Sequence, residues 1–227
     1  ITAFGNLSSS DLTALAFDNE KGRKLYVGCN NGDVLMINFS TGMILTQLQV
    51  HLKEVTCLYS EPGVPGTSHT TNIIVSGSLD GRLRVLEEVS GELNIHYTTD
   101  NPFLDNSPIG FIKGFSLVKL MVVASTGLVW TVWNITHHKR LMLLKEDTPI
   151  LAVEILTDPK FVATEEKRQE AVAAAELNGD KPPDASRDVK HHAGPAAPKE
   201  NLLTVAIATV HGVNIFTLDV LENLAVK

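Results

Sequence analysis

Residues 75–87 read Val-Ser-Gly-Ser-Leu-Asp-Gly-Arg-Leu-Arg-Val-Leu-Glu, and they carry the clearest indication of the chain's architecture. Two runs in which apolar and polar side chains alternate flank Leu79-Asp80-Gly81, a tripeptide typical of a tight turn. Alternation with a period of two is the pattern of a β-strand whose faces differ in exposure. These residues therefore predict two antiparallel strands joined by a hairpin.

Strand-like segments on both sides of this hairpin complete a unit of four, and an earlier stretch has the same layout. Turn glycines of the two units stand at one common offset of 49 residues, which indicates an internal repeat. The glycine pairs are Gly28 with Gly77, Gly32 with Gly81 and Gly42 with Gly91. The strands are predicted at Leu12 to Phe17, Lys24 to Gly28, Asp33 to Phe39 and Met43 to Val50, then at Val55 to Ser60, Ile73 to Ser78, Arg82 to Val89 and Glu92 to Tyr97.

Two further units follow with looser spacing. The third has Gly127 as its turn residue, 46 residues after Gly81, and the fourth has Gly212. We therefore expect an all-β chain of about four four-stranded antiparallel units. The strands are predicted at Ile109 to Phe115, Lys119 to Ala124, Leu128 to Trp133 and Leu141 to Lys145, then at Ile150 to Leu156, Leu202 to Thr209, Val213 to Leu218 and Leu221 to Val226.

Residues 157–200 differ in composition from the rest. They are charged, then alanine-rich, then proline-rich, and they lack the apolar side chains that a packed core needs. We predict a disordered, charged insert within the fourth unit. Residues 1–156 then hold three units and the first strand of the fourth, and 201–227 hold its remainder. Smaller inserts are expected at Glu61 to Asn72 and Tyr97 to Pro108.

The composition indicates the cellular compartment of the chain and excludes some classes of partner. The chain has 227 residues and a net charge of −7, so it offers no basic surface for nucleic acid. Cys29 and Cys57 stand in apolar segments, as buried reduced thiols do, which favours a reducing, cytoplasmic compartment. We recognise no targeting signal and no run of eighteen apolar residues, and we expect no membrane span.

Residues Val75 to Glu87 resemble the second strand, acidic turn and third strand of a WD40 repeat, and His51 stands where that family places the histidine that opens a blade. The resemblance implies a WD40-like β-propeller. In such blades the histidine, a strand Ser or Thr, the turn Asp and the Trp of the Trp-Asp pair form a buried hydrogen-bonded set. The resemblance assigns these roles to His51, Ser76 and Asp80, and turn positions to Gly32 and Gly81.

The chain departs from the WD pattern at the tryptophan. Leu86-Glu87 stands at the Trp-Asp position of the second unit and Ile37-Asn38 at that of the first. Trp133-Asn134 comes closest, although it lies six residues after Gly127 where Leu86 lies five after Gly81. The polar set is therefore expected to be incomplete. Because WD40 rings need about seven blades, we expect the four units to be part of a larger propeller.

The resemblance implies a non-enzymatic protein–protein interaction scaffold without a cofactor, in a large intracellular assembly. Asp11 to Asp18, Gly22-Arg23-Lys24-Leu25 and Asn38 to Gly42 resemble blades of the large WD-repeat proteins of cilia and flagella, which implies axonemal, microtubule-associated partners. Two alternatives stay open. One is a WD adaptor of a coat, ubiquitin-ligase or chromatin complex. The other is a quinoprotein-like oxidoreductase. Residues Asn38 to Leu45 match the repeat motif of such enzymes, although Thr46 stands where their repeats have a docking tryptophan.

No catalytic or cofactor-binding residues are identifiable, because motifs for hydrolysis, metalloproteolysis and phosphate binding are missing from the sequence. His137-His138 would bind a metal only if a third ligand converged, and none is visible, so we expect no metal site. His191-His192 in the insert is a weaker candidate. Trp130 and Trp133 are three apart in one predicted strand and face opposite sides. We expect one in the core and Trp130 exposed as a partner contact.

Overall fold

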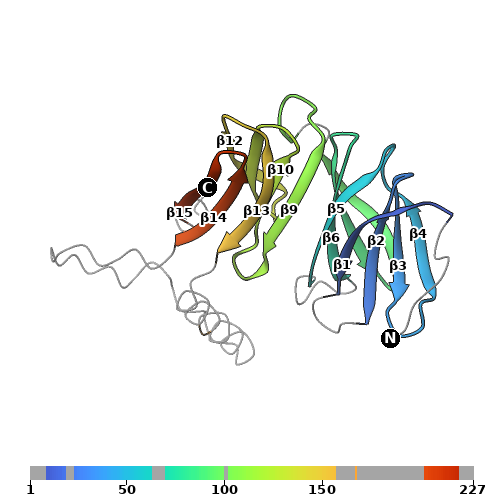
Figure 1. Ribbon diagram of the computed structural model, residues 1–227. Coiled ribbons are helices and arrows are strands. Elements are labelled where there is room, and N and C mark those ends of the chain that lie inside the picture. The colour runs from blue at the N-terminus through green and yellow to red at the C-terminus, as the bar shows by residue number, and fades with distance from the viewer. Residues whose placement is uncertain are drawn as a thin grey trace. The chain divides into compact units, whose positions relative to one another are not determined.

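The protein is described by a computed structural model that covers residues 9–18, 23–62, 70–99, 102–156, 167 and 202–219. Within these ranges the chain forms strands β1 to β15 and one short 3₁₀ turn, η1 (Ser116–Val118) (Figure 1). Apart from Lys167, the described residues confirm the prediction of β structure.

Three four-stranded antiparallel sheets follow one another along the chain, and each keeps its strands in sequence order. They confirm the first three predicted units. The second sheet is larger than predicted, because β5 and β6 pair as far as Pro62 with Asn72 and β8 runs on to Thr99. The strands are β1 (Leu12–Phe17), β2 (Lys24–Cys29), β3 (Asp33–Asn38) and β4 (Ile44–Gln49); β5 (Val55–Pro62), β6 (Thr70–Ser78), β7 (Leu83–Val89) and β8 (Glu92–Thr99); β9 (Ile109–Phe115), β10 (Leu120–Ser125), β11 (Val129–Asn134) and β12 (Lys139–Lys145).

A fourth sheet contains β13 (Ile150–Leu156), β14 (Leu202–Thr209) and β15 (Gly212–Asp219), in that order. The predicted last strand, Leu221 to Val226, lies outside the described residues, and so does the predicted insert at 157–200 except for Lys167. By its contacts the chain divides into two units, 1–154 with 207–214 and 155–206 with 215–227. The three four-stranded sheets all belong to the first unit.

The first three sheets pack face to face through apolar side chains. One buried cluster joins Tyr26 and Met36 of the first sheet to Ile74 and Leu86 of the second. Another joins the opposite face of the second sheet to the third, with Trp133 among its members. Both faces of the second sheet are thus largely covered, so polar side chains of its middle strands such as Ser76 and Glu88 are buried as well. The first strands β1, β5 and β9 contact one another in turn (Figure 1).

The ladders align the sheets residue by residue. Gly28 pairs with Val34, Gly77 with Leu83 and Ala124 with Trp130, and five residues separate the partners each time. Each first strand also carries a register shift at the same place, near Thr13, Thr56 and Gly110, which is the signature of a repeated β-bulge.

This alignment corrects one prediction, the turn glycine of the third unit. Gly127 is equivalent to Asp80, and Leu128 is equivalent to Gly81. Gly81 has a φ of 77° and Gly32 one of 91°, whereas Gly127 does not lie in this left-handed region. The two turns differ in one hydrogen bond: the hydroxyl of Ser78 accepts from the N–H of Asp80, whereas that of Ser125 accepts from the N–H groups of both Gly127 and Val129.

Candidate functional site

The structure brings together His51, Ser76 and Asp80, the three side chains that the resemblance assigned to one set. The Nδ1 atom of His51 lies 3.1 Å from Oδ2 of Asp80, and its Nε2 atom lies 2.8 Å from Oγ of Ser76. A carboxylate only accepts hydrogen bonds, so Nδ1 carries the proton. Nε2 of the neutral ring then accepts from the Ser76 hydroxyl.

The backbone of His51 ties this set to the preceding sheet. Its N–H donates to the carbonyl of Gly32 at 2.9 Å. A Cβ atom on Gly32 would lie 2.1 Å from the carbonyl oxygen of His51, so no other residue fits there. His51 therefore connects the β2–β3 turn of the first sheet to the β6–β7 turn of the second. Asp80 completes the second turn by accepting from the N–H groups of Arg82 at 2.9 Å and Leu52 at 3.1 Å.

Burial decides the protonation of the set. Burial lowers the pKa of His51 below its ordinary value, against the opposing effect of Asp80. Burial alone would raise the pKa of Asp80, but its contact with His51 and the bonds from the backbone of Arg82 and Leu52 hold that pKa below its usual range. At neutral pH the set is a neutral imidazole on a carboxylate.

The order serine, histidine, aspartate is also that of hydrolase triads, so the chemistry must be considered. Ser76 has no exposed surface and His51 is 1% exposed. A nucleophile has to reach its substrate, and the Ser76 hydroxyl is covered. The set holds two sheets together and does not offer a reaction site.

The equivalent positions of the other two sheets lack this set. Val27 and Asn31 stand in the first sheet, and Val123 and Gly127 in the third, where the second has Ser76 and Asp80. The strand pairing makes Trp133 equivalent to Leu86. Trp133 lies six residues after Gly127, and Leu86 five after Gly81, because Gly127 stands one position earlier in its turn than Gly81. The Trp133 indole donates to Oγ1 of Thr131 at 2.8 Å and has no histidine or aspartate partner. The next residue, Asn134, accepts from the backbone N–H of His137 at 2.9 Å and so closes the β11–β12 turn.

The prediction that Trp130 is exposed as a partner contact is wrong. Trp130 does face away from Trp133, but it has no exposed surface. Its indole N–H donates to Oε1 of buried Glu146 at 2.8 Å, and Nδ2 of Asn214 donates to the other carboxylate oxygen at 2.6 Å. The prediction assumed that only one face of this sheet is covered, whereas both are.

A buried carboxylate that the sequence did not indicate lies between the first and second sheets. Glu88 is 1% exposed and accepts from the Tyr26 hydroxyl at 2.8 Å, from Nδ2 of Asn72 at 2.9 Å and from the Lys24 ammonium. Burial alone would raise the pKa of Glu88, but these hydrogen bonds hold it below its usual range. Tyr26 and Lys24 come from β2, so this cluster is a second polar link between the sheets.

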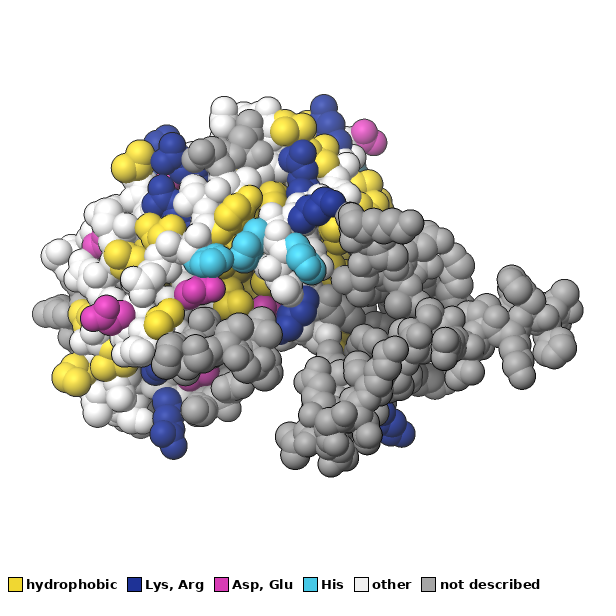
Figure 2. All heavy atoms as spheres, turned by 180° about the vertical axis from the view of Figure 1, so that it is seen from behind, with side chains coloured by type: hydrophobic (Ala, Val, Ile, Leu, Met, Phe, Trp, Pro, Cys, Tyr) yellow, Lys and Arg dark blue, Asp and Glu magenta, His cyan; other side chains and the backbone are white. Residues whose placement is uncertain are grey.

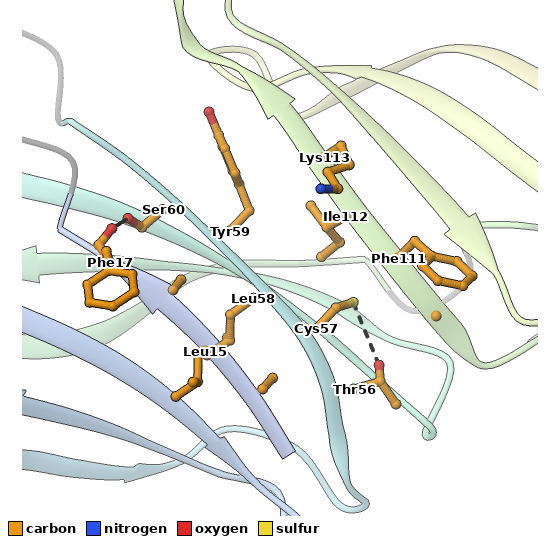
Figure 3. Close-up of a pocket in the computed structure, with 13 residues that line it drawn as sticks. Leu15, Phe17, Thr56, Cys57, Leu58, Tyr59, Ser60, Phe111, Ile112 and Lys113 are labelled. Atoms are coloured by element: carbon orange, nitrogen blue, oxygen red, sulfur yellow. Dashed lines mark hydrogen bonds between the residues drawn. The ribbon is translucent and has the colours of Figure 1, made fainter. Parts of the chain in front are cut away.

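A groove of about 530 Å³ runs along the first strands of the three sheets. Figure 3 shows Leu15 and Phe17 of β1 on one side, β5 in the middle and Phe111, Ile112 and Lys113 of β9 on the other. Leu15 is 59% and Phe17 52% exposed. Burial raises the pKa of the Cys57 thiol, which also lines the groove, to about 12, so this thiol is not a ready nucleophile.

The groove is mainly apolar in character. Its one lysine, Lys113, already pairs with Glu154 at 2.9 Å. Its hydroxyl groups are engaged too: Thr56 donates to the carbonyl of Ile109 at 2.5 Å, and Ser60 donates to that of Phe17. No sequence pattern predicts this groove, because its three walls come from strands far apart in the chain.

No family model matches the chain, and no curated protein matches it. Two solved structures similar to it are computationally designed proteins, Ika8 and Ika4. The likeness to Ika8 covers 93% of this chain and 47% of that one, at 17% identity and a TM-score of 0.57. The likeness to Ika4 covers 93% of each chain, at 18% identity and a TM-score of 0.58. The chain thus spans about half the length of Ika8, and at these identities the likeness concerns the fold alone.

Proposed function

We propose that the chain is part of a WD40-like β-propeller and serves as a non-enzymatic scaffold for protein–protein interactions. The order of the strands supports the propeller. The first strands of successive sheets contact one another and line one groove, as the innermost strands of blades do. Each of the three four-stranded sheets has the same bulge in its first strand and the same turn length between its second and third strands. In this proposal the three complete sheets and β13 to β15 are four blades, and further blades complete the ring.

One observation carries the scaffold function, the exposure of Leu15 and Phe17 in the groove. Large apolar side chains that gather in a concave, exposed place are typical of surfaces that bind other proteins. The polar and charged groups of the groove are already engaged within the chain. We therefore propose that the groove receives apolar side chains from an extended segment of a partner protein, and that no cofactor is involved.

The setting follows from the resemblance to ciliary and flagellar WD-repeat proteins. We propose a cytoplasmic protein of the axoneme, with microtubule-associated proteins as partners. The net charge of −7 supports contact with acidic tubulin through other proteins rather than directly. Across the described ranges, no helix is long and apolar enough to cross a membrane.

The test is affinity purification of the full-length parent protein from its native cells, in three forms. The double change Leu15→Ser and Phe17→Ser should remove a defined set of co-purified proteins. Leu52→Ser, at a side chain that is 78% exposed and outside the groove, should leave that set in place. Equal recovery from all three forms would reject the groove as the binding site.

The identity of the proteins that are lost tests the setting separately. Axonemal proteins in that set would support the cilium. Subunits of a coat, ubiquitin-ligase or chromatin complex would retain the scaffold and reject the ciliary assignment.

A further inference from the structure

Histidines gather on one face of the molecule where the second sheet meets the third, next to acidic and basic side chains (Figure 2). The sequence had shown His137-His138 as a pair that lacked a further ligand. The structure places a histidine of another sheet beside this pair: the rings of His96, on β8, and His138, in the β11–β12 turn, lie with their centres 5.2 Å apart. Glu87 of β7 lies 3.5 Å from Nδ1 of His96.

The two neighbouring histidines differ in their hydrogen bonds. Nδ1 of His137 lies 3.0 Å from Oδ1 of Asn134 and is therefore engaged. Nδ1 of His138 is buried and has no hydrogen-bond partner. A buried nitrogen without a partner is costly, and it is the kind of atom that a bound ligand satisfies.

His138 is also held in a defined place. Its backbone has a φ of 49°, in the left-handed region, and its ring stacks on Tyr97 at 4.9 Å with an angle of 14° between the planes. Burial first, and then the neighbouring His96, lower the pKa of His138.

We propose that His96 and His138 together bind a divalent transition-metal ion of the zinc, nickel and copper class, with Glu87 as the third ligand. Two imidazoles that bind one tetrahedral ion through nitrogens at about 2.0–2.1 Å have ring centres roughly 5 Å apart, which is the spacing of this pair. Imidazole is the ligand that these metals prefer, and a carboxylate is an ordinary third ligand.

The site closes on binding and is not preformed. In the described part of the chain, no three His, Cys, Asp or Glu side chains already stand in an arrangement that could hold a metal ion. His96 is the movable member, because its side chain is 46% exposed and rests on Glu87, which is 28% exposed. A bound ion would connect β8 of the second sheet with the β11–β12 turn of the third.

The experiment is a calorimetric titration of zinc chloride into the chain at pH 7.5. The background carries His191→Gln and His192→Gln, which removes the other histidine pair. We expect one saturable site, whose affinity falls at least about tenfold in His96→Gln and in His138→Gln, a loss that even outer-shell changes around a metal can cause. His137→Gln is the matched control and should bind within a factor of two of the background.

A second readout separates metal binding from a loss of structure. Zinc should raise the thermal midpoint of the background protein and of His137→Gln, but not that of His96→Gln. Absence of a saturable site, or equal affinity in His96→Gln and His137→Gln, would overturn the proposal.

Discussion

Replacing Asp80 with alanine tests whether the set of His51, Ser76 and Asp80 stabilises the fold. The change removes the acceptor for three donors: Nδ1 of His51 at 3.1 Å, the N–H of Leu52 at 3.1 Å and that of Arg82 at 2.9 Å. Leu52 is 78% exposed, so water replaces its lost bond. His51 is buried, and its Nδ1 proton is left without a partner.

An unsatisfied buried polar group costs about 1–3 kcal/mol. We therefore expect Asp80→Ala to lower the free energy of unfolding by about 2 kcal/mol, equivalent to a fall of about 6 °C in the thermal midpoint of a chain of this size. Asp80→Asn keeps an acceptor for Arg82 but loses the negative charge, and it should lie about halfway. The measurement is urea unfolding followed by circular dichroism at pH 7.5.

The matched control is Asn31→Ala, at the equivalent turn of the first sheet. Asn31 also accepts from the N–H two residues on, that of Asp33, at 3.1 Å. Its Nδ2 atom donates to the Asp33 carboxylate at 2.9 Å, but that carboxylate keeps Gln47 as a donor when Asn31 is removed. Val27 stands where the second sheet has Ser76. This control should lose about 0.5–1 kcal/mol, the contribution of an ordinary hydrogen bond. If Asp80→Ala cost no more than Asn31→Ala, the hydrogen bond between His51 and Asp80 would contribute nothing to the stability of the fold.

Two further predictions concern pH and packing between the sheets. The pKa of His51 is lowered in the folded chain, so the unfolded chain takes up the proton first. His51 therefore makes its full contribution to stability above pH 6.5, the ordinary pKa of histidine, and that contribution is lost as the pH falls below 6.5. The urea midpoint should be lower at pH 5.5 than at pH 7.5, and His51→Gln should reduce this difference. An unchanged difference would show that His51 does not cause the pH dependence. Gly77→Ala should cost about 1–3 kcal/mol in urea unfolding, because the new Cβ would lie 2.5 Å from Cγ2 of Ile109. Gly91→Ala, with nothing within 4 Å, should cost only about 1 kcal/mol from its positive φ, and equal losses would speak against close packing at Gly77.

The strands and their grouping could be predicted because their signals are local. Alternation of apolar and polar residues reports which side chains are covered, and residues such as Gly81 and Gly91 report turns that need a positive φ. The glycine signal failed at Gly127, where the hydroxyl of Ser125 closes the turn in another way. A glycine in a turn can thus stand at different positions of that turn, and only the pairing of the flanking strands shows which position it occupies.

The sites were harder to predict because they join segments distant in the chain. The resemblance to WD40 repeats was the only basis for predicting that His51, Ser76 and Asp80 form one hydrogen-bonded set, because such repeats have known positions for these side chains. Nothing local to Glu88 indicates that Tyr26 and Lys24, from the preceding sheet, will surround it. The same is true of His96 and His138, which belong to different sheets.

The order of amino acids alone predicts that the chain is built of β-strands, where most of them lie and, for the first three units, which four strands form one sheet. These properties follow from side-chain alternation and turn chemistry within some ten residues. Packing between the sheets determines that Trp130 is buried, that Leu15 and Phe17 stay exposed and that His96 lies beside His138. The sequence of a strand shows how polar each of its faces is, but the neighbouring sheet determines what covers that face.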